Sequence, residues 1–200
     1  MTVPVPVPQP AVPRDELSPA LEAVWTQVEE QVQINRPEGP EENTMENVQL
    51  WAEGPFQEWI EQRRTALEQT RALVAEVSAE PPYERAIALA LFAYAFEDFG
   101  AQIGGAPVPD EIANDDELRG IYIESLNRAT LPLGHRMIEF YADCQTRLES
   151  LGNESAWLPW RAHCVQRGQA VIEGYGLAPE PAPEEAPESS APPETNPSDM

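Results

Sequence analysis

Apolar residues recur at three- and four-residue spacing through most of the chain, and this period is typical of amphipathic helices. No segment alternates apolar and polar residues over the length of a strand. Proline and glycine mark the breaks between helical segments. The segments that we expect cover approximately residues 15–35, 44–53, 55–78, 83–103, 114–151 and 154–175. The chain is therefore predicted to be all-α.

Short breaks between long helices favour antiparallel neighbours. We expect helical hairpins, arranged either as a stack like that of tetratricopeptide repeats or as an irregular bundle. No clean repeat of about 34 residues is visible, so a regular array does not follow from the sequence. Pro132 and Gly134 fall inside the fifth segment and are expected to kink or divide it.

The segment 83–103 is apolar on nearly every face in its middle, where the sequence reads ALALFAYAF. Such a helix needs neighbours on several sides, so it should lie at the centre of the core. Its apolar run, Ala86 to Phe96, is shorter than the ~18 to 20 residues of a membrane-spanning helix. We expect a core helix and no membrane insertion. Leu89, Phe92, Phe96, Met137, Tyr141 and Trp160 are the side chains expected to be buried.

The two ends differ from the body in composition. Residues 1–13 alternate Val and Pro, which excludes helix and predicts an extended arm. Residues 179–200 are rich in Pro and Glu and hold no large apolar residue before the last Met, which predicts a disordered acidic tail. We expect the arm to be disordered as well, with the helical domain covering residues 14–178. The first residues do not resemble a secretory signal peptide.

The charge excludes two kinds of partner. The chain has 35 Asp and Glu against 12 basic residues, a formal net charge of -23. A surface this negative repels phosphate backbones and anionic lipid headgroups, so we expect no nucleic-acid binding. The partner that remains is another protein, and the sequence does not identify it.

Cys144 and Cys164 lie on the apolar stripes of two segments that meet at Gly152 and Asn153. In an antiparallel hairpin they reach nearly the same height, so a disulfide between them is geometrically allowed. The alternative is two reduced, buried cysteines that pack as small apolar side chains. A disulfide requires an oxidising compartment, which favours the periplasm or cell envelope slightly over the cytoplasm.

Several stretches of residues 83–175 carry a resemblance to a known group of proteins. They are FAYAFEDF, GAPVPDEI, LRGIYIESLNRATLPL, FYADCQTRLESLG, and a final helix with Trp and the pair His-Cys. In these stretches the chain resembles the C-terminal helical region of tetratricopeptide-like proteins of the myxobacterial cell envelope, some of them linked to gliding motility. The resemblance implies a helical scaffold that acts outside the cytoplasm. The chain departs from that pattern because it has no lipoprotein cysteine near its start and no full repeat array upstream.

An enzyme or metal protein is the alternative class. It would use Cys144, Cys164, His135 or His163, but these residues have no standard metal-ligand spacing. Adjacent helical residues point about 100° apart, so His163 does not face Cys164 as a catalytic partner. We expect no catalytic residue, no metal and no cofactor.

The acidic pair Glu97 and Asp98 is interpreted as part of an interhelix ion pair, with Arg119 or Arg128 as partner. Most tryptophans are assigned to the core. Trp51, in the short segment before Gly54 and Pro55, is the candidate anchor for a partner because complete burial is hardest there. The sequence thus predicts a non-enzymatic protein-binding or scaffold module, part of an envelope-associated assembly.

Overall fold

The computed structural model describes residues 2–152 and 155–177, and the predicted acidic tail 179–200 lies outside the described residues. The described residues form helices and connecting segments, without a β-strand, so the all-α prediction is confirmed. The helices are α1 (Pro19–Val32), α2 (Met45–Trp51), α3 (Gln57–Glu76), α4 (Pro82–Gly104), α5 (Asp110–Ala113), α6 (Asp116–Glu149) and α7 (Leu158–Tyr175). A 3-10 turn, η1 (Arg14–Glu16), precedes α1.

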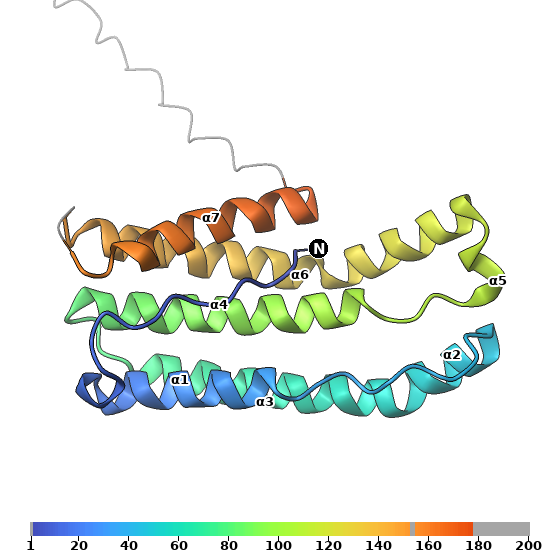
Figure 1. Ribbon diagram of the computed structural model, residues 1–200, viewed down its shortest axis with the longest axis horizontal. Coiled ribbons are helices and arrows are strands. Elements are labelled where there is room, and N and C mark those ends of the chain that lie inside the picture. Colours follow the sequence, from blue (N-terminus) through green and yellow to red (C-terminus); the bar gives the residue numbers. More distant parts are fainter. Residues whose placement is uncertain (1, 153–154, 178–200) are drawn as a thin grey trace, which may run out of the picture.

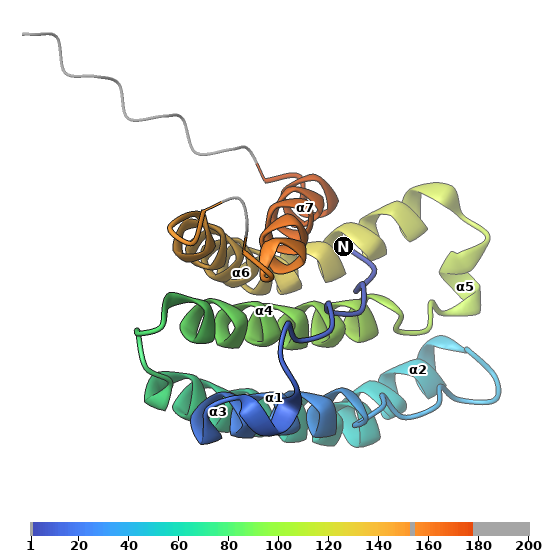
Figure 2. The same ribbon diagram turned by 60° about the vertical axis from the view of Figure 1, so that its left-hand side comes forward.

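The helices are arranged in layers around α4 (Figure 1). Helices α1 and α3 pack on one side of α4, and α6 packs on the other with α7 beside it (Figure 2). The central position predicted for the segment 83–103 is therefore confirmed. Ala86 to Ala93 are all at most 5% exposed, because neighbours surround this part of the helix. The expected core is buried except for Phe96, which is half-buried.

Polar side chains cap the N-termini of several helices. Ser18 accepts a hydrogen bond from the backbone N–H of Leu21 at the start of α1. Asp115 accepts bonds from the N–H groups of Glu117 and Leu118 and caps α6. The helix α7 ends at Gly176, whose φ of 63° lies in the left-handed region that glycine adopts most readily.

The helix α6 runs through Pro132 as one helix of 34 residues, so Pro132 does not divide it. Its first part, residues 116–129, rises away from α4 and contains no buried side chain (Figure 1). From Thr130 onward it packs on α4, with Met137, Tyr141, Cys144 and Leu148 buried. The two parts of α6 therefore have different environments, and the proline lies near the change.

The N-terminal arm is extended as predicted, but residues 2–13 are not free of the body. They lie across the domain, passing α4 (Figures 1 and 2). The indole N–H of Trp160 donates to the carbonyl of Gln9 at 3.0 Å, and Arg167 Nη2 donates to the carbonyl of Val3 at 2.9 Å. Val7, Ala11 and Val12 pack against the core. The expectation of a disordered arm is wrong for these residues, because it ignored the carbonyl groups that an extended chain offers to donors.

The helix α4 is longer than the apolar run identified in the sequence. With 23 residues and a mean hydropathy of 1.3 in its most apolar window, it is long and apolar enough to cross a membrane by length and composition. In this structure 67% of that window is buried among the other helices. In this structure the apolar helix α4 thus forms the centre of the core.

Candidate functional site

An apolar groove of about 730 Å³ lies between α3, α4 and α6. Its floor is formed by α4, where Phe96, Phe99 and Ile103 share one face at three- and four-residue spacing. The walls come from α3 and α6. The apolar wall residues are Phe56, Ile60, Leu67, Leu126, Ala129 and Leu133.

The groove exists because α4 carries apolar side chains on a face that neither α3 nor α6 covers completely. Phe99 is 4% exposed, whereas Phe96 and Ile103 are half-buried. Leaving apolar surface in contact with water costs free energy, about 25 cal/mol per Å². A concave apolar surface with a polar rim is the usual form of a binding groove on a soluble domain.

The rim on the α3 side is charged. Glu61, Arg64 and Glu68 line this edge. Arg64 pairs with Glu61 at 3.1 Å, and Glu68 pairs with Arg71 at 2.8 Å, both between exposed side chains. Such exposed pairs contribute little to stability, so these side chains are available to turn toward a ligand.

On α6 the apolar wall continues beyond the groove. Leu118, Tyr122, Leu126, Ala129 and Leu133 follow each other at spacings of three or four residues and share one face of the helix. Leu118 is 44% exposed, and Ile121 near it is 54% exposed. The groove and this exposed end of α6 together form an apolar strip along the helix.

Trp51 is not the exposed anchor that the sequence suggested. It is 7% exposed, and its ring stacks on Phe56 with centroids 4.5 Å apart. Its indole N–H donates to the carbonyl of Glu38 at 2.7 Å. The chain kinks at Gly54, whose φ and ψ are not helical, in the segment η2 (Ala52–Phe56) between α2 and α3. The sequence pattern marks a break at Gly54 and Pro55 but does not indicate that the Trp51 ring is buried.

A buried polar cluster lies between α4, α6 and α7. The guanidinium of Arg167 contacts both carboxylate oxygens of Glu97 at 3.0–3.3 Å. Burial raises the pKa of Glu97 to about 7, although Arg167 acts in the opposite direction. Burial also raises the pKa of the Tyr141 hydroxyl well above its ordinary value, and the charge of Glu97 adds to this effect. The cluster joins three helices.

The partners of Glu97 and Asp98 differ from those expected. Asp98 pairs with Arg63 of α3 at 2.7 Å, and Glu97 pairs with Arg167 of α7. Arg119 and Arg128 instead pair with Asp116 and Glu124 of their own helix. Both predicted partners lie on the part of α6 that rises away from α4, which is why they do not reach the acidic pair.

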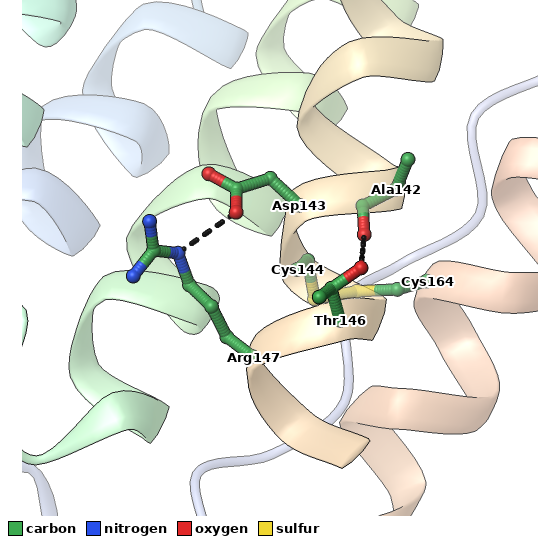
Figure 3. Close-up of a disulfide and its surroundings, with 6 residues drawn as sticks. All are labelled: Ala142, Asp143, Cys144, Thr146, Arg147 and Cys164. Atoms are coloured by element: carbon green, nitrogen blue, oxygen red, sulfur yellow. Dashed lines mark hydrogen bonds and ion pairs between the residues drawn. A yellow bond between two sulfur atoms is a disulfide. The ribbon is translucent and has the colours of Figure 1, made fainter. Parts of the chain in front are cut away.

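The structure contains the disulfide that the sequence allowed between the last two helices. Cys144 of α6 and Cys164 of α7 are bonded, with their Cα atoms 6.3 Å apart (Figure 3). Both are buried, at most 1% exposed. Near the disulfide on α6, Asp143 pairs with Arg147 at 2.9 Å, and Thr146 donates to the carbonyl of Ala142 (Figure 3).

The cysteines and histidines that an enzyme or metal protein would use do not come together in one site. The two cysteines are consumed in the disulfide, so neither offers a thiolate in this state. His135 is exposed on α6. His163 is 7% exposed, and burial, followed by the charge of Arg167, lowers its pKa to about 4. Within residues 2–152 and 155–177, no group of three or more His, Cys, Asp or Glu side chains is placed to hold a metal ion.

The fold and the groove define a class: an all-helical protein with an apolar groove formed by three of its helices. No protein family, no curated protein and no solved structure matches the chain.

The sequence pattern did not mark the groove residues as a binding site. Ile60, Phe96 and Leu133 belong to segments that were correctly predicted as helices, but their apolar character was assigned to the core. One sequence signal for the groove lies in residues 118–133. There, apolar residues occupy more of the helix circumference than a single buried face requires.

Proposed function

We propose that the protein is a non-enzymatic binding module that holds an amphipathic helix of another protein in the groove between α3, α4 and α6. The groove itself supports this proposal, because it presents the half-buried Phe96, Ile103 and Leu133 in one concave apolar surface. An apolar helix face with anchors at three- and four-residue spacing fits such a surface.

The charge of the chain favours a basic partner helix. With a net charge of -23, the molecule attracts Arg- and Lys-rich segments and repels acidic ones, including a second copy of itself. On the rim, Glu61 and Glu68 would face the polar side of the bound helix. An envelope-associated assembly is the setting that the resemblance and the disulfide together favour.

A peptide titration tests this proposal. The probe is a synthetic 18-residue amphipathic helix with Leu on one face and Lys on the other, and its binding is compared between the wild-type protein and Leu133→Glu. We expect the groove variant to bind at least ten-fold more weakly, because it places a charge in the apolar wall. Leu50→Glu is the matched control, since Leu50 is 62% exposed on α2 and lies outside the groove.

Equal binding by Leu133→Glu and the wild-type protein would contradict the proposal. If Leu133→Glu does not fold, Ala129→Glu replaces it, because Ala129 lines the groove and is exposed. Equal loss of affinity in Leu50→Glu would show that the loss does not depend on the groove, since an added carboxylate by itself strengthens the attraction of a Lys-rich peptide.

A further inference from the structure

The N-terminal arm occupies a second groove, on another side of α4 from the first. Residues 2–13 lie over α1, α4 and α7 (Figure 2). A cavity of about 270 Å³ beside the arm is lined by the segment 6–10, by Trp25 and Val28 of α1, and by Leu91 and Tyr94 of α4. The indole of Trp160 meets Trp25 edge to face, with centroids 5.4 Å apart. Aromatic side chains thus support the extended segment.

The body binds the arm through backbone carbonyls. Trp160 donates to Gln9, and Arg167 donates to Val3, each from a side chain on α7. In a polyproline II chain the carbonyls have no internal partner, and three residues make one turn. Positions 3 and 9 are two turns apart, so their carbonyls fall on the same edge of the arm. This combination of aromatic surface and carbonyl-directed donors is how Pro-rich segments are recognised in general.

The donors are held in place by the rest of the structure. Trp160, Cys164 and Arg167 follow at spacings of four and three residues, so they share one face of α7. The disulfide fixes Cys164 to α6, and Glu97 contacts the guanidinium of Arg167 from α4. Trp160 packs edge to face on Trp25, and Arg167 is held by Glu97, so contacts that do not involve the arm position both donors.

The arm itself is bound on the surface like a ligand. None of residues 2–13 is buried, and Val3 is 80% exposed although its carbonyl is bonded. By contrast, the first buried residue in the described part of the chain is Leu17, after the arm has ended. The helical core is therefore formed by residues beyond the arm.

From these contacts we infer that α1, α4 and α7 form a binding site for extended Val/Pro-rich segments. Residues 2–13 occupy this site from within the chain, and a Val/Pro-rich segment of a partner protein displaces them. The arm has the advantage of being tethered, so a competing segment must overcome a high effective concentration. This site is separate from the groove between α3, α4 and α6, and its failure would leave the proposed function untouched.

The test uses a variant that lacks residues 2–13, titrated with a synthetic peptide of the same sequence and followed by tryptophan fluorescence. We expect saturable binding to the truncated protein and at least ten-fold weaker binding to the full-length protein, in which the tethered arm competes. A peptide with every Pro replaced by Ala should bind more weakly to the truncated protein, because it loses the preformed extended conformation.

A pair of substitutions in the truncated protein tests the donor. Trp160→Phe keeps an aromatic ring but removes the N–H group that Gln9 accepts from, and it should lower the affinity for the peptide. Trp25→Phe is the matched control, since Trp25 supplies ring surface to the same groove. A larger loss for Trp25→Phe than for Trp160→Phe would contradict recognition through the carbonyl.

Absence of binding to a folded truncated protein at millimolar peptide would overturn the inference. If the truncated chain does not fold, a protease site inserted between Pro13 and Arg14 replaces the deletion. After cleavage, the arm should remain bound in native mass spectrometry and should be released by excess peptide. Immediate loss of the cleaved arm would also overturn it.

Discussion

At the scale of single residues, buried charges connect the layers. Arg63 is 0% exposed, and its guanidinium donates to the carbonyl of Gln31 at 2.8 Å and to Asp98 at 2.7 Å. These two bonds reach α1 and α4 from α3. Removing one partner of a buried pair leaves the other without compensation, which costs more than the pair contributes.

We expect Arg63→Met to lower the free energy of unfolding by roughly 3 kcal/mol, because the Asp98 carboxylate loses its charged partner and two backbone carbonyls each lose one of their donors. Arg64→Met is the matched control. Arg64 is exposed and pairs only with Glu61 of its own helix in this structure, so its loss should change stability by less than ~0.5 kcal/mol. Urea titration of both variants measures the difference, and equal effects would contradict the role of Arg63.

The raised pKa of Glu97 predicts that the stability of the fold depends on pH. Its pKa is about 7 in the folded protein, above the ordinary value of 4.5, because burial favours the neutral carboxyl group. Its contribution to stability is therefore complete below about pH 4.5 and is lost as the pH rises through 7. Each pH unit in that window costs up to ~1.4 kcal/mol.

The measurement compares the wild-type protein with Glu97→Gln, which does not titrate. We expect the unfolding free energy of the wild-type protein to fall relative to the variant between pH 4.5 and 7. His163, with a pKa lowered to about 4, acts in the opposite direction, since its contribution is lost as the pH falls from 6.5 to 4. It is present in both proteins and cancels in the comparison. Parallel stability curves would rule out a raised pKa for Glu97.

The sequence predicted some residue-level features and missed others. The Cys144–Cys164 pair followed from helix periodicity, because both residues lie on stripes that face each other across one short turn. The ion pair between Arg63 and Asp98 joins residues 35 positions apart, so no local pattern could reveal it. The burial of Trp51 depends on its contacts with Phe56 and with the carbonyl of Glu38, which a break in the helical pattern does not reveal.

At the scale of elements, α7 is held by side chains on one face. Trp160, Cys164, Arg167 and Val171 are all buried there. The disulfide closes a loop between Cys144 and Cys164, which are 20 positions apart in the sequence. In the chain-entropy account, a loop of this length stabilises the fold by restricting the unfolded chain.

We expect the double substitution Cys144→Ala and Cys164→Ala to lower the unfolding free energy by about 2 to 4 kcal/mol. Hydrogen exchange should increase most in α7, because this helix would then be attached to α6 by packing alone. Reduced wild-type protein should show the same change. Unaltered exchange in α7 would mean that packing and the Glu97–Arg167 contact suffice to hold it.

The helices themselves were largely predictable, because a 3.6-residue apolar period and capping residues are local signals. The segment 83–103 corresponds to α4 (Pro82–Gly104) to within one residue at each end. The arm was predicted to be extended, but its docking was not, since it depends on Trp160 and Arg167 more than 150 residues away. Composition describes an isolated segment and contains no information about distant donors.

At the scale of the whole molecule, two sides of α4 differ in what covers them. One is covered by the chain's own N-terminal arm, and another is left as the apolar groove between α3 and α6. The groove could not be predicted, because the sequence shows which faces are apolar but not which neighbours are missing. A binding module accounts for this uncovered apolar surface on a molecule that otherwise presents many charges.

Methyl-group NMR provides the most direct test of this account. The basic amphipathic peptide is titrated into protein labelled at Ile and Leu methyl groups, and the position of each shift change is mapped. The account predicts the largest changes at Ile60, Ile103, Leu126 and Leu133, with Leu50 unchanged. Changes spread evenly over the exposed Ile and Leu residues, or centred on α2, would contradict a binding site between α3, α4 and α6.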